Sequence, residues 1–159
     1  MRTPQRARVI IDLIDSNSFR RVAEIGVCKG ETAIPVMISC QINDFLLVDP
    51  DFNNVHGLIE MAQSHHFVRL ADMTSESAAV ITDDFYFDLV FVDALHDEES
   101  VDRDIHLWTP KVRKGGIICG HDYDNRRFPG VKNAVDRMFG VENVRTEPVR
   151  ACKVWIVQL

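Results

Sequence analysis

The chain has 159 residues, of which 46% are hydrophobic and 26% charged, and its formal net charge is −6. This length supports one well-packed core, so we expect a single domain over residues 1–159. The acidic charge argues against a nucleic-acid partner, which would need a basic face. No apolar run approaches membrane-spanning length and no signal peptide is visible, so we expect a soluble protein without a membrane partner.

The four cysteines have neither the paired spacing of a metal site nor a secretory context. Three of them stand in apolar stretches, which favours reduced core residues in a cytoplasmic protein. The four are Cys28, Cys40, Cys119 and Cys152.

Residues 1–18 predict an amphipathic helix. Thr3 fits its N-cap and Pro4 its first position, and apolar residues recur at helical spacing until about Asn17. Residues 20–159 form the predicted core. It opens with a strand at 20–26 and a glycine turn, followed by a helix at 31–40 and a strand at 45–50.

The middle of the chain continues this alternation. Short helices are predicted at residues 55–64 and 75–81, on either side of a strand that starts at residue 66 and leads into Asp72. Residues 87–93 are nearly all apolar, as is typical of a strand covered on both faces. A helix is predicted at 98–108, and Pro110 stops it.

Residues 112–120 predict another strand, with a turn at Gly115 and Gly116. The polar segment 122–130 is expected to be a loop. A helix at 131–139, closed by Gly140, and short strands at 143–146 and 153–158 complete the chain. Strands that alternate with helices predict an α/β fold, with a Rossmann-like, doubly wound, mostly parallel seven-stranded sheet and helices on both faces.

An acidic residue stands at or just past the end of five predicted strands. Ligands of such sheets bind beyond the carboxyl ends of the strands, so together these acids predict a cleft lined with carboxylates. Each one alone is about as compatible with a turn-forming or helix-capping role. The five are Glu24, Asp49, Asp72, Asp93 and Asp122.

The turn after the first strand reads Glu24-x-Gly26-x-x-x-Gly30. A dinucleotide fingerprint, G-x-G-x-x-G, would need glycine where Cys28 and Glu31 stand. An NAD-dependent or nucleotide-sugar enzyme on a similar sheet is therefore disfavoured. Taken alone, the turn fits any strand-to-helix connection of an α/β protein equally well.

Residues 20–139 resemble the class I S-adenosylmethionine-dependent methyltransferases, and within them the small-molecule O-methyltransferase-like group (methyltransferase family 24). The resemblance rests on the Glu24-x-Gly26-x-x-x-Gly30 turn, on Asp49, and on the stretches FVDALHD (91–97) and WTPKVRKGGIICGHDY (108–123). It implies an enzyme that transfers the methyl group of S-adenosylmethionine to the hydroxyl of a small-molecule or sugar acceptor.

The resemblance also implies which residues bind the cofactor. The turn would hold the methionine portion with Glu24 facing its ammonium group, Asp49 would accept hydrogen bonds from the ribose hydroxyls, and Asp72 would accept one from the adenine amine. The implied set is Glu24, Gly26, Val27, Lys29, Gly30, Thr32, Asp49, Pro50, Ala71, Asp72, Met73 and Asp93.

Some similar enzymes hold a magnesium-type ion at acids that end two neighbouring strands, where it binds and acidifies the acceptor hydroxyl. The matching residues are Asp93 and Asp122, with His121 where an acid is common. A divalent metal such as Mg or Mn at these three residues and a metal-free mechanism are both open. His96 is the predicted general base, because imidazole titrates near neutral pH, and Asp97 is the second candidate.

Other interpretations of the function stay open as well. One is a methyltransferase-like module that binds the cofactor without catalysis. No insertion is long enough to form a lid, so the acceptor would be recognised by loop 122–130, the N-terminal helix or a second subunit of a homodimer. Arg126 and Arg127 could clamp an anionic acceptor, although a solvated pair is the simpler interpretation.

Overall fold

The computed structural model describes residues 3–55 and 57–159, so the predictions for residues 1, 2 and 56 lie outside the described residues. The strands are β1 (Arg21–Ile25), β2 (Asp44–Asp49), β3 (Val68–Asp72), β4 (Phe87–Val92), β5 (Val112–Tyr123), β6 (Arg145–Val149) and β7 (Cys152–Gln158). The helices are α1 (Gln5–Asn17), α2 (Ala33–Ser39), α3 (Leu58–Ser64), α4 (Ser75–Val80), α5 (Glu98–Trp108) and α6 (Pro129–Phe139). Three short 3-10 helices, η1 (Phe52–Asn54), η2 (Thr109–Lys111) and η3 (Val141–Asn143), lie in the connections.

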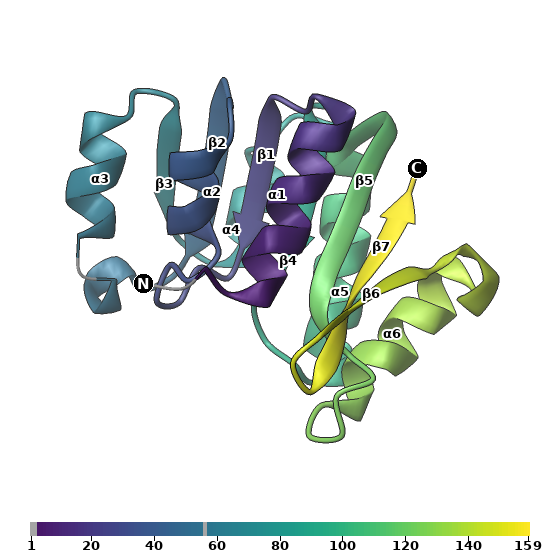
Figure 1. Cartoon of the computed structure of the whole chain (residues 1–159). Coiled ribbons are helices and arrows are strands. Elements are labelled where there is room, and N and C mark those ends of the chain that lie inside the picture. The colour runs from purple at the N-terminus through teal and green to yellow at the C-terminus, as the bar shows by residue number, and fades with distance from the viewer. Residues whose placement is uncertain (1–2, 56) are drawn as a thin grey trace.

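The strands form one seven-stranded sheet in the order β3-β2-β1-β4-β5-β7-β6 (Figure 1). Strands β1 to β5 are parallel, whereas β7 runs antiparallel to both β5 and β6. The predicted Rossmann-like, mostly parallel α/β fold is therefore confirmed. No helix of the described chain is long and apolar enough to cross a membrane.

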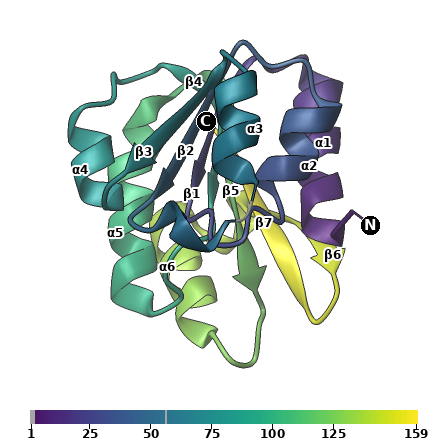
Figure 2. The same cartoon turned by 90° about the vertical axis from the view of Figure 1, so that its left-hand side faces the viewer.

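Helices cover both faces of the sheet. α1, α2 and α3 lie on one face and α4, α5 and α6 on the other (Figures 1 and 2). Side chains of β4 contribute to both layers, in alternation from Leu89 on: Leu89 and Phe91 join the core under α1 to α3, while Phe87, Val90 and Val92 join the core under α4 to α6. Every residue of β4 is buried, as its apolar run predicts.

β5 departs most from the sequence-based prediction. Gly115 and Gly116 lie inside the strand, where a register shift interrupts its pairing with β4. The strand then continues to Tyr123, and Asp122 adopts a left-handed φ of 58° beside a second register shift, against β7. The predicted loop 122–130 is therefore only a short turn, because Pro129 already begins α6.

Three other predicted boundaries also move. Pro4, not Thr3, is the N-cap of α1. α2 begins only at Ala33, because the turn before it is longer than expected. The strand predicted at 143–146 is displaced to β6, since η3 occupies the preceding residues.

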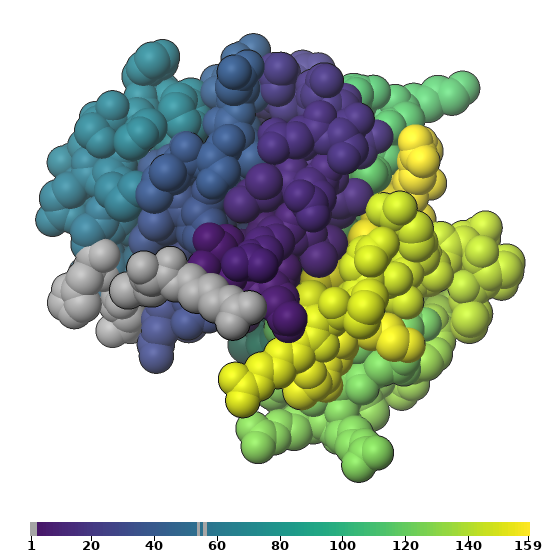
Figure 3. All heavy atoms as spheres, in the orientation of Figure 1, coloured from purple at the N-terminus to yellow at the C-terminus, as the bar shows by residue number. Residues whose placement is uncertain are grey.

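The hairpin of β6 and β7 extends the sheet beside α1 (Figure 3). The backbone N–H of Arg150, in the hairpin turn, donates a hydrogen bond of 2.7 Å to Oε1 of Gln5. The first turn of α1 is thereby tied to the C-terminal part of the chain.

Gly26 marks the closest approach of two backbones at the carboxyl edge of the sheet. Its φ is +87°, and a Cβ atom built on it would lie 2.4 Å from the Cα of Ala94. Its N–H donates to the carbonyl of Val48 at 2.9 Å, so the turn after β1 fits tightly between the ends of β2 and β4. A side chain at this position would have to displace the backbone after β4.

We predict that Gly26→Ala destabilises the fold by roughly 2–4 kcal/mol, because left-handed strain adds to overpacking against backbone. Gly57→Ala is the matched control: Gly57 has a similar φ of +80°, but nothing lies within 4 Å of its added Cβ. The Gly57→Ala control should lower the free energy of unfolding by only roughly 1–2 kcal/mol. Urea unfolding of both variants measures the difference, and equal losses would show that the contact with Ala94 is not limiting.

Candidate functional site

A cavity of about 420 Å³ lies at the carboxyl edge of the sheet. Its walls come from the glycine turn, the end of β2, the start of α4, the segment after β4, and α5. The lining residues are Ile25, Gly26, Cys28, Val48, Asp49, Pro50, Thr74, Ser75, Glu76, Asp93, Ala94, Leu95, Ser100, Arg103 and Asp104.

The residues expected to bind a cofactor fall into two groups. Gly26, Asp49, Pro50 and Asp93 line the cavity. The others stand outside its lining: Glu24 of β1 and Val27, Gly30 and Thr32 of the turn are buried, Lys29 is exposed, and Ala71 and Asp72 end β3 with Met73 directly after them.

Asp49 fixes the shape of the turn. Its Oδ2 accepts hydrogen bonds from the N–H groups of Val27 at 2.9 Å and Cys28 at 2.8 Å, and its Oδ1 accepts one from Asp51 at 2.9 Å. These bonds hold Cys28 at a left-handed φ of 49°, which a side-chain-bearing residue rarely adopts. A carboxylate has about four acceptor sites and three are used here, so Asp49 can still accept one hydrogen bond from a ligand in the cavity.

Glu24 is a carboxylic acid with little solvent contact, since it is only 3% exposed. Within the described chain no group donates a hydrogen bond to its side chain, and its resolved interactions are electrostatic ones with Asp93, Arg6 and Asp49. Burial first, and the Asp93 carboxylate second, raise the pKa of Glu24 well above its usual value. An incoming cation would stabilise its ionised form.

A second group of side chains, which we call the histidine-carboxylate cluster, gathers at the ends of β4, β5 and β7. Nε2 of His96 lies 2.8 Å from Oδ2 of Asp122 and 3.6 Å from Oδ1 of Asp93. Nδ1 of His121 lies 3.1 Å from the same Asp122 oxygen, and its Nε2 lies 3.2 Å from Sγ of Cys152. The left-handed backbone at Asp122 breaks the strand alternation, so consecutive residues reach the same cluster.

The cluster contains the three predicted metal ligands and two other side chains that carry ligand atoms. Asp93, His121 and Asp122 are brought together as expected, with Nδ1 of His121 3.7 Å from Oδ1 of Asp93. His96 and Cys152 complete two overlapping sets whose ligand atoms lie within 4.8 Å of one another. Imidazole, thiolate and carboxylate ligands together suit Mn, Fe or Zn better than Mg.

His96 is positively charged at neutral pH in this arrangement. Its hydrogen bond to Asp122, and then that to Asp93, raise its pKa to about 9. Its ring also stacks on Phe128, with a distance of 4.4 Å between ring centroids. Both carboxylates therefore favour the protonated ring, which opposes a role of His96 as general base.

Asp97, the second candidate base, caps α5. Its Oδ1 accepts a hydrogen bond of 3.0 Å from the backbone N–H of Ser100, and this bond lowers the pKa of Asp97. Its side chain is exposed and makes no contact with the cluster among the interactions of the described residues.

Arg6 enters the site from α1, which the sequence did not indicate. Its Nη2 lies 2.7 Å from Oε2 of Glu31, and its Nε donates to Oγ1 of Thr32 at 3.1 Å. The same Nε lies 3.6 Å from Oδ2 of Asp93. Arg6 therefore links the N-terminal helix to both the glycine turn and the cluster.

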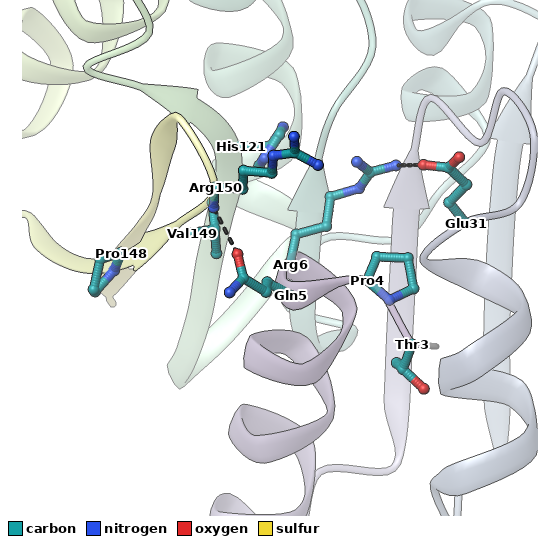
Figure 4. A pocket seen from close by; sticks show the side chains of 9 residues that line it. All are labelled: Thr3, Pro4, Gln5, Arg6, Glu31, His121, Pro148, Val149 and Arg150. Carbon is teal, nitrogen blue, oxygen red and sulfur yellow. Dashed lines mark hydrogen bonds and ion pairs between the residues drawn. The ribbon is translucent and has the colours of Figure 1, made fainter. Parts of the chain in front are cut away.

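A second and larger cavity, of about 800 Å³, opens on the other side of Arg6. Figure 4 shows Arg6 and Arg150 extending into the space between His121 and Glu31. The remaining lining residues come from the start of α1 and from the β6–β7 turn: Thr3, Pro4, Gln5, Pro148 and Val149. Arg126 and Arg127 are not part of this lining.

Sequence reasoning also missed Asp104 in α5. It is 5% exposed, lines the first cavity, and its Oδ1 accepts a hydrogen bond of 2.5 Å from the hydroxyl of Ser75. Burial raises its pKa to about 6. The sequence does indicate that Asp104 is buried, because this acid falls on the apolar face that Val101, Ile105 and Trp108 form at helical spacing.

Residues 23–123 match the family profile described as a methyltransferase domain. The match covers well over half of the chain, so the chain belongs to this methyltransferase family. The resemblance inferred from the sequence is thereby confirmed. A search of curated proteins gives no match.

Solved structures show the same fold. The O-methyltransferase from Bacillus cereus in complex with S-adenosylhomocysteine is 16% identical, with a TM-score of 0.72 over 100% of this chain and 83% of that one. The O-methyltransferase TomG from Streptomyces achromogenes, in complex with S-adenosylmethionine, is 12% identical, with a TM-score of 0.74 over 96% and 79%. The N-methyltransferase NodS from Bradyrhizobium japonicum is 13% identical, with a TM-score of 0.67 over 97% and 93%. This is the class I S-adenosylmethionine-dependent methyltransferase fold, and it hosts both O- and N-methyl transfer.

We predict that Asp104→Asn stabilises the protein at pH 8 by roughly 1–3 kcal/mol and has little effect near pH 4. The folded-state pKa of about 6 is above the unfolded value, so ionisation costs stability as the pH rises through 6. The groups that shift this pKa are Ser75 and Glu76 of α4, Arg103 of α5, and Asp97.

Urea unfolding at pH 4.5 and pH 8 measures the effect. The control is Asp83→Asn, because Asp83 is exposed and lies far from the cavity. A stability difference between Asp104→Asn and the parent that stays constant with pH would contradict the prediction.

Proposed function

We propose that this protein binds S-adenosylmethionine in the 420 Å³ cavity and transfers its methyl group to a hydroxyl of a small-molecule acceptor. The observation that carries the proposal is the cavity itself, which is lined by both the bare backbone of Gly26 and the Asp49 carboxylate. Both residues belong to the segment that matches the methyltransferase family.

The residues at the turn fit the methionine end of this cofactor. Gly26 offers backbone without a side chain, and Glu24 beneath it has no hydrogen-bond donor among the described residues. An ammonium group there would supply the cation that this buried carboxylate lacks. Three of the roughly four acceptor sites of Asp49 hold the turn, which leaves one for a ribose hydroxyl.

The acceptor belongs in the larger cavity, between α1 and the β6–β7 turn. Its wall includes His121, a member of the histidine-carboxylate cluster, and Arg6, which also contacts Asp93 at the border of the first cavity. A sulfonium donor is already activated, so the protein mainly has to align the acceptor with the methyl group and remove its proton.

A divalent cation fits the cluster, and Asp93, Asp122 and His121 would hold it, since Nδ1 of His121 lies 3.1 Å from Asp122 and 3.7 Å from Asp93. His96 and Cys152 carry further ligand atoms beside Asp122. Such an ion lowers the pKa of a bound hydroxyl. His96 would be the residue to take the acceptor's proton, because the Asp93 and Asp122 carboxylates that favour its protonated form would pair with the cation instead.

We predict that S-adenosylhomocysteine binds the intact protein and that Asp49→Ala weakens binding by about 10- to 100-fold, because hydrogen bonds to a charged group are lost. Titration calorimetry measures both affinities, and Asp83→Asn serves as the control. Thermal unfolding of Asp49→Ala separates loss of the ligand contact from loss of the turn.

No heat of binding with the intact protein, or equal affinity of Asp49→Ala, would overturn the cofactor assignment. Stronger binding of NAD in a competition titration would favour the nucleotide enzyme instead. Binding without any methyl transfer to a panel of hydroxyl compounds would favour a non-catalytic binding module.

The metal hypothesis predicts that the intact protein, with S-adenosylhomocysteine present, reduces the electron paramagnetic resonance signal of free Mn²⁺. Asp122→Asn should weaken Mn²⁺ binding by at least about 10-fold, since it removes a ligand oxygen shared by both sets. Cys152→Ser should leave Mn²⁺ binding nearly unchanged and weaken Zn²⁺ binding, because the thiolate prefers the softer ion. An unchanged Mn²⁺ signal would support a metal-free mechanism.

A further inference from the structure

Asp104 has a buried carboxylate to which the proposed methyl transfer gives no role. It lines the cofactor cavity where α5 meets α4, and it belongs neither to the glycine turn nor to the histidine-carboxylate cluster. Nothing in methyl transfer itself requires an acid there. A buried carboxylate without an ion-pair partner costs stability, so its presence in a ligand cavity points to a role in recognition.

The orientation of this carboxylate is fixed by a chain of hydrogen bonds. Nε1 of Trp108 donates to Oγ of Ser75 at 2.9 Å. An indole N–H can only donate, so the Ser75 oxygen accepts this bond and its own proton goes to Oδ1 of Asp104, 2.5 Å away. Trp108 is fully buried, which makes the arrangement rigid.

The second oxygen of Asp104 is left with acceptor capacity. Within the described chain, Oδ2 receives no hydrogen bond. The neighbouring Arg103 does not pair with it, because its guanidinium lies 3.0 Å from Glu76 and 3.1 Å from Glu99. Asp104 therefore offers the cavity an oriented acceptor that needs an N–H or O–H donor from a ligand.

The elements that line the cavity indicate which part of the cofactor reaches this oxygen. With the methionine at Gly26 and the ribose at Asp49, the part lined by α4, α5 and the segment after β4 is left for the adenine. The walls there include Val48, Pro50 and the exposed side chain of Leu95, which suit the faces of a flat ring. The donor on the edge of that ring is the 6-amino group of adenine.

Resting on the proposed function, we propose that Asp104 is the residue that recognises the adenine 6-amino group and so sets the specificity for an adenosyl cofactor. Asp72, which the family resemblance implies for this task, is exposed and does not line the cavity. Ser75 and Trp108 act as positioning residues for Asp104. The carboxylate accepts from an amino group and repels the oxygen of a 6-oxo purine.

The test compares two ligands that differ only at the purine 6-position, S-adenosylhomocysteine and S-inosylhomocysteine, by titration calorimetry on the intact protein at pH 8. The native protein should prefer the adenosyl ligand by about 10- to 100-fold. Asp104→Asn should abolish or invert the preference, because its amide can donate to the 6-oxo oxygen. Asp83→Asn, the exposed control, should keep the native preference.

A second measurement uses the native protein alone. Its preference for S-adenosylhomocysteine over S-inosylhomocysteine should shrink between pH 8 and pH 5. Asp104 becomes protonated over this range and can then donate to the 6-oxo oxygen. The groups that face Asp104 are Ser75 and Glu76 of α4, Arg103 of α5, and Asp97. Using the ratio of the dissociation constants of the two ligands cancels pH effects elsewhere in the site.

Several outcomes would overturn the inference. Equal binding of the two ligands to the native protein, a preference that Asp104→Asn retains, or a switch caused by Asp72→Asn instead would each do so. Failure of S-adenosylhomocysteine to bind at all would overturn the proposed function as well. Binding of S-adenosylhomocysteine with no Asp104 effect leaves the proposed function standing and removes only this inference.

Discussion

The site depends on how Asp49 holds the turn after β1. One carboxylate oxygen binds two consecutive N–H groups, of Val27 and Cys28, and so ties the end of β2 to a backbone that would otherwise avoid a left-handed residue at 28. Gly26 also constrains the turn, because without a side chain its backbone packs directly against Ala94. Because the turn is fixed from both sides, the cavity between β1, β2 and β4 has a preformed wall, and a ligand there loses little ordering entropy on binding.

Converging strand ends bring like charges together at this wall. Asp93 and Asp49 add to the effect of burial in raising the pKa of Glu24, and Arg6 lowers it in part. Arg6 from α1 approaches Asp93, and protonated His96 bridges Asp93 and Asp122. A cationic ligand or ion would compete for the same carboxylates, so binding and the internal ion pairs are coupled through shared acceptors.

The fold could be predicted from the sequence because each strand and helix is encoded by the residues of its own segment. A fully buried parallel strand reads as an apolar run, and α5 was predicted to the residue because its apolar residues recur at helical spacing and Pro110 stops it. The cleft of carboxylates followed from the same logic. By contrast, the bulge that turns Asp122 beside His121 and the approach of Cys152 come from pairing of β5 with β7, which no local pattern encodes. Arg6 was missed for the same reason.

Asp104 shows how stability and recognition oppose each other within one helix. On the buried stripe of α5 an apolar residue would pack without penalty, whereas burial here moves the pKa of a carboxyl to about 6 and leaves it ionised at neutral pH. Ser75 satisfies one oxygen only. The energetic cost is therefore recovered only when a donor enters the cavity, and an adenine amino group is a donor with the required size and flat shape. A carboxylate also penalises the 6-oxo purine, which a neutral hydroxyl at the same place would tolerate, since it can donate as well as accept.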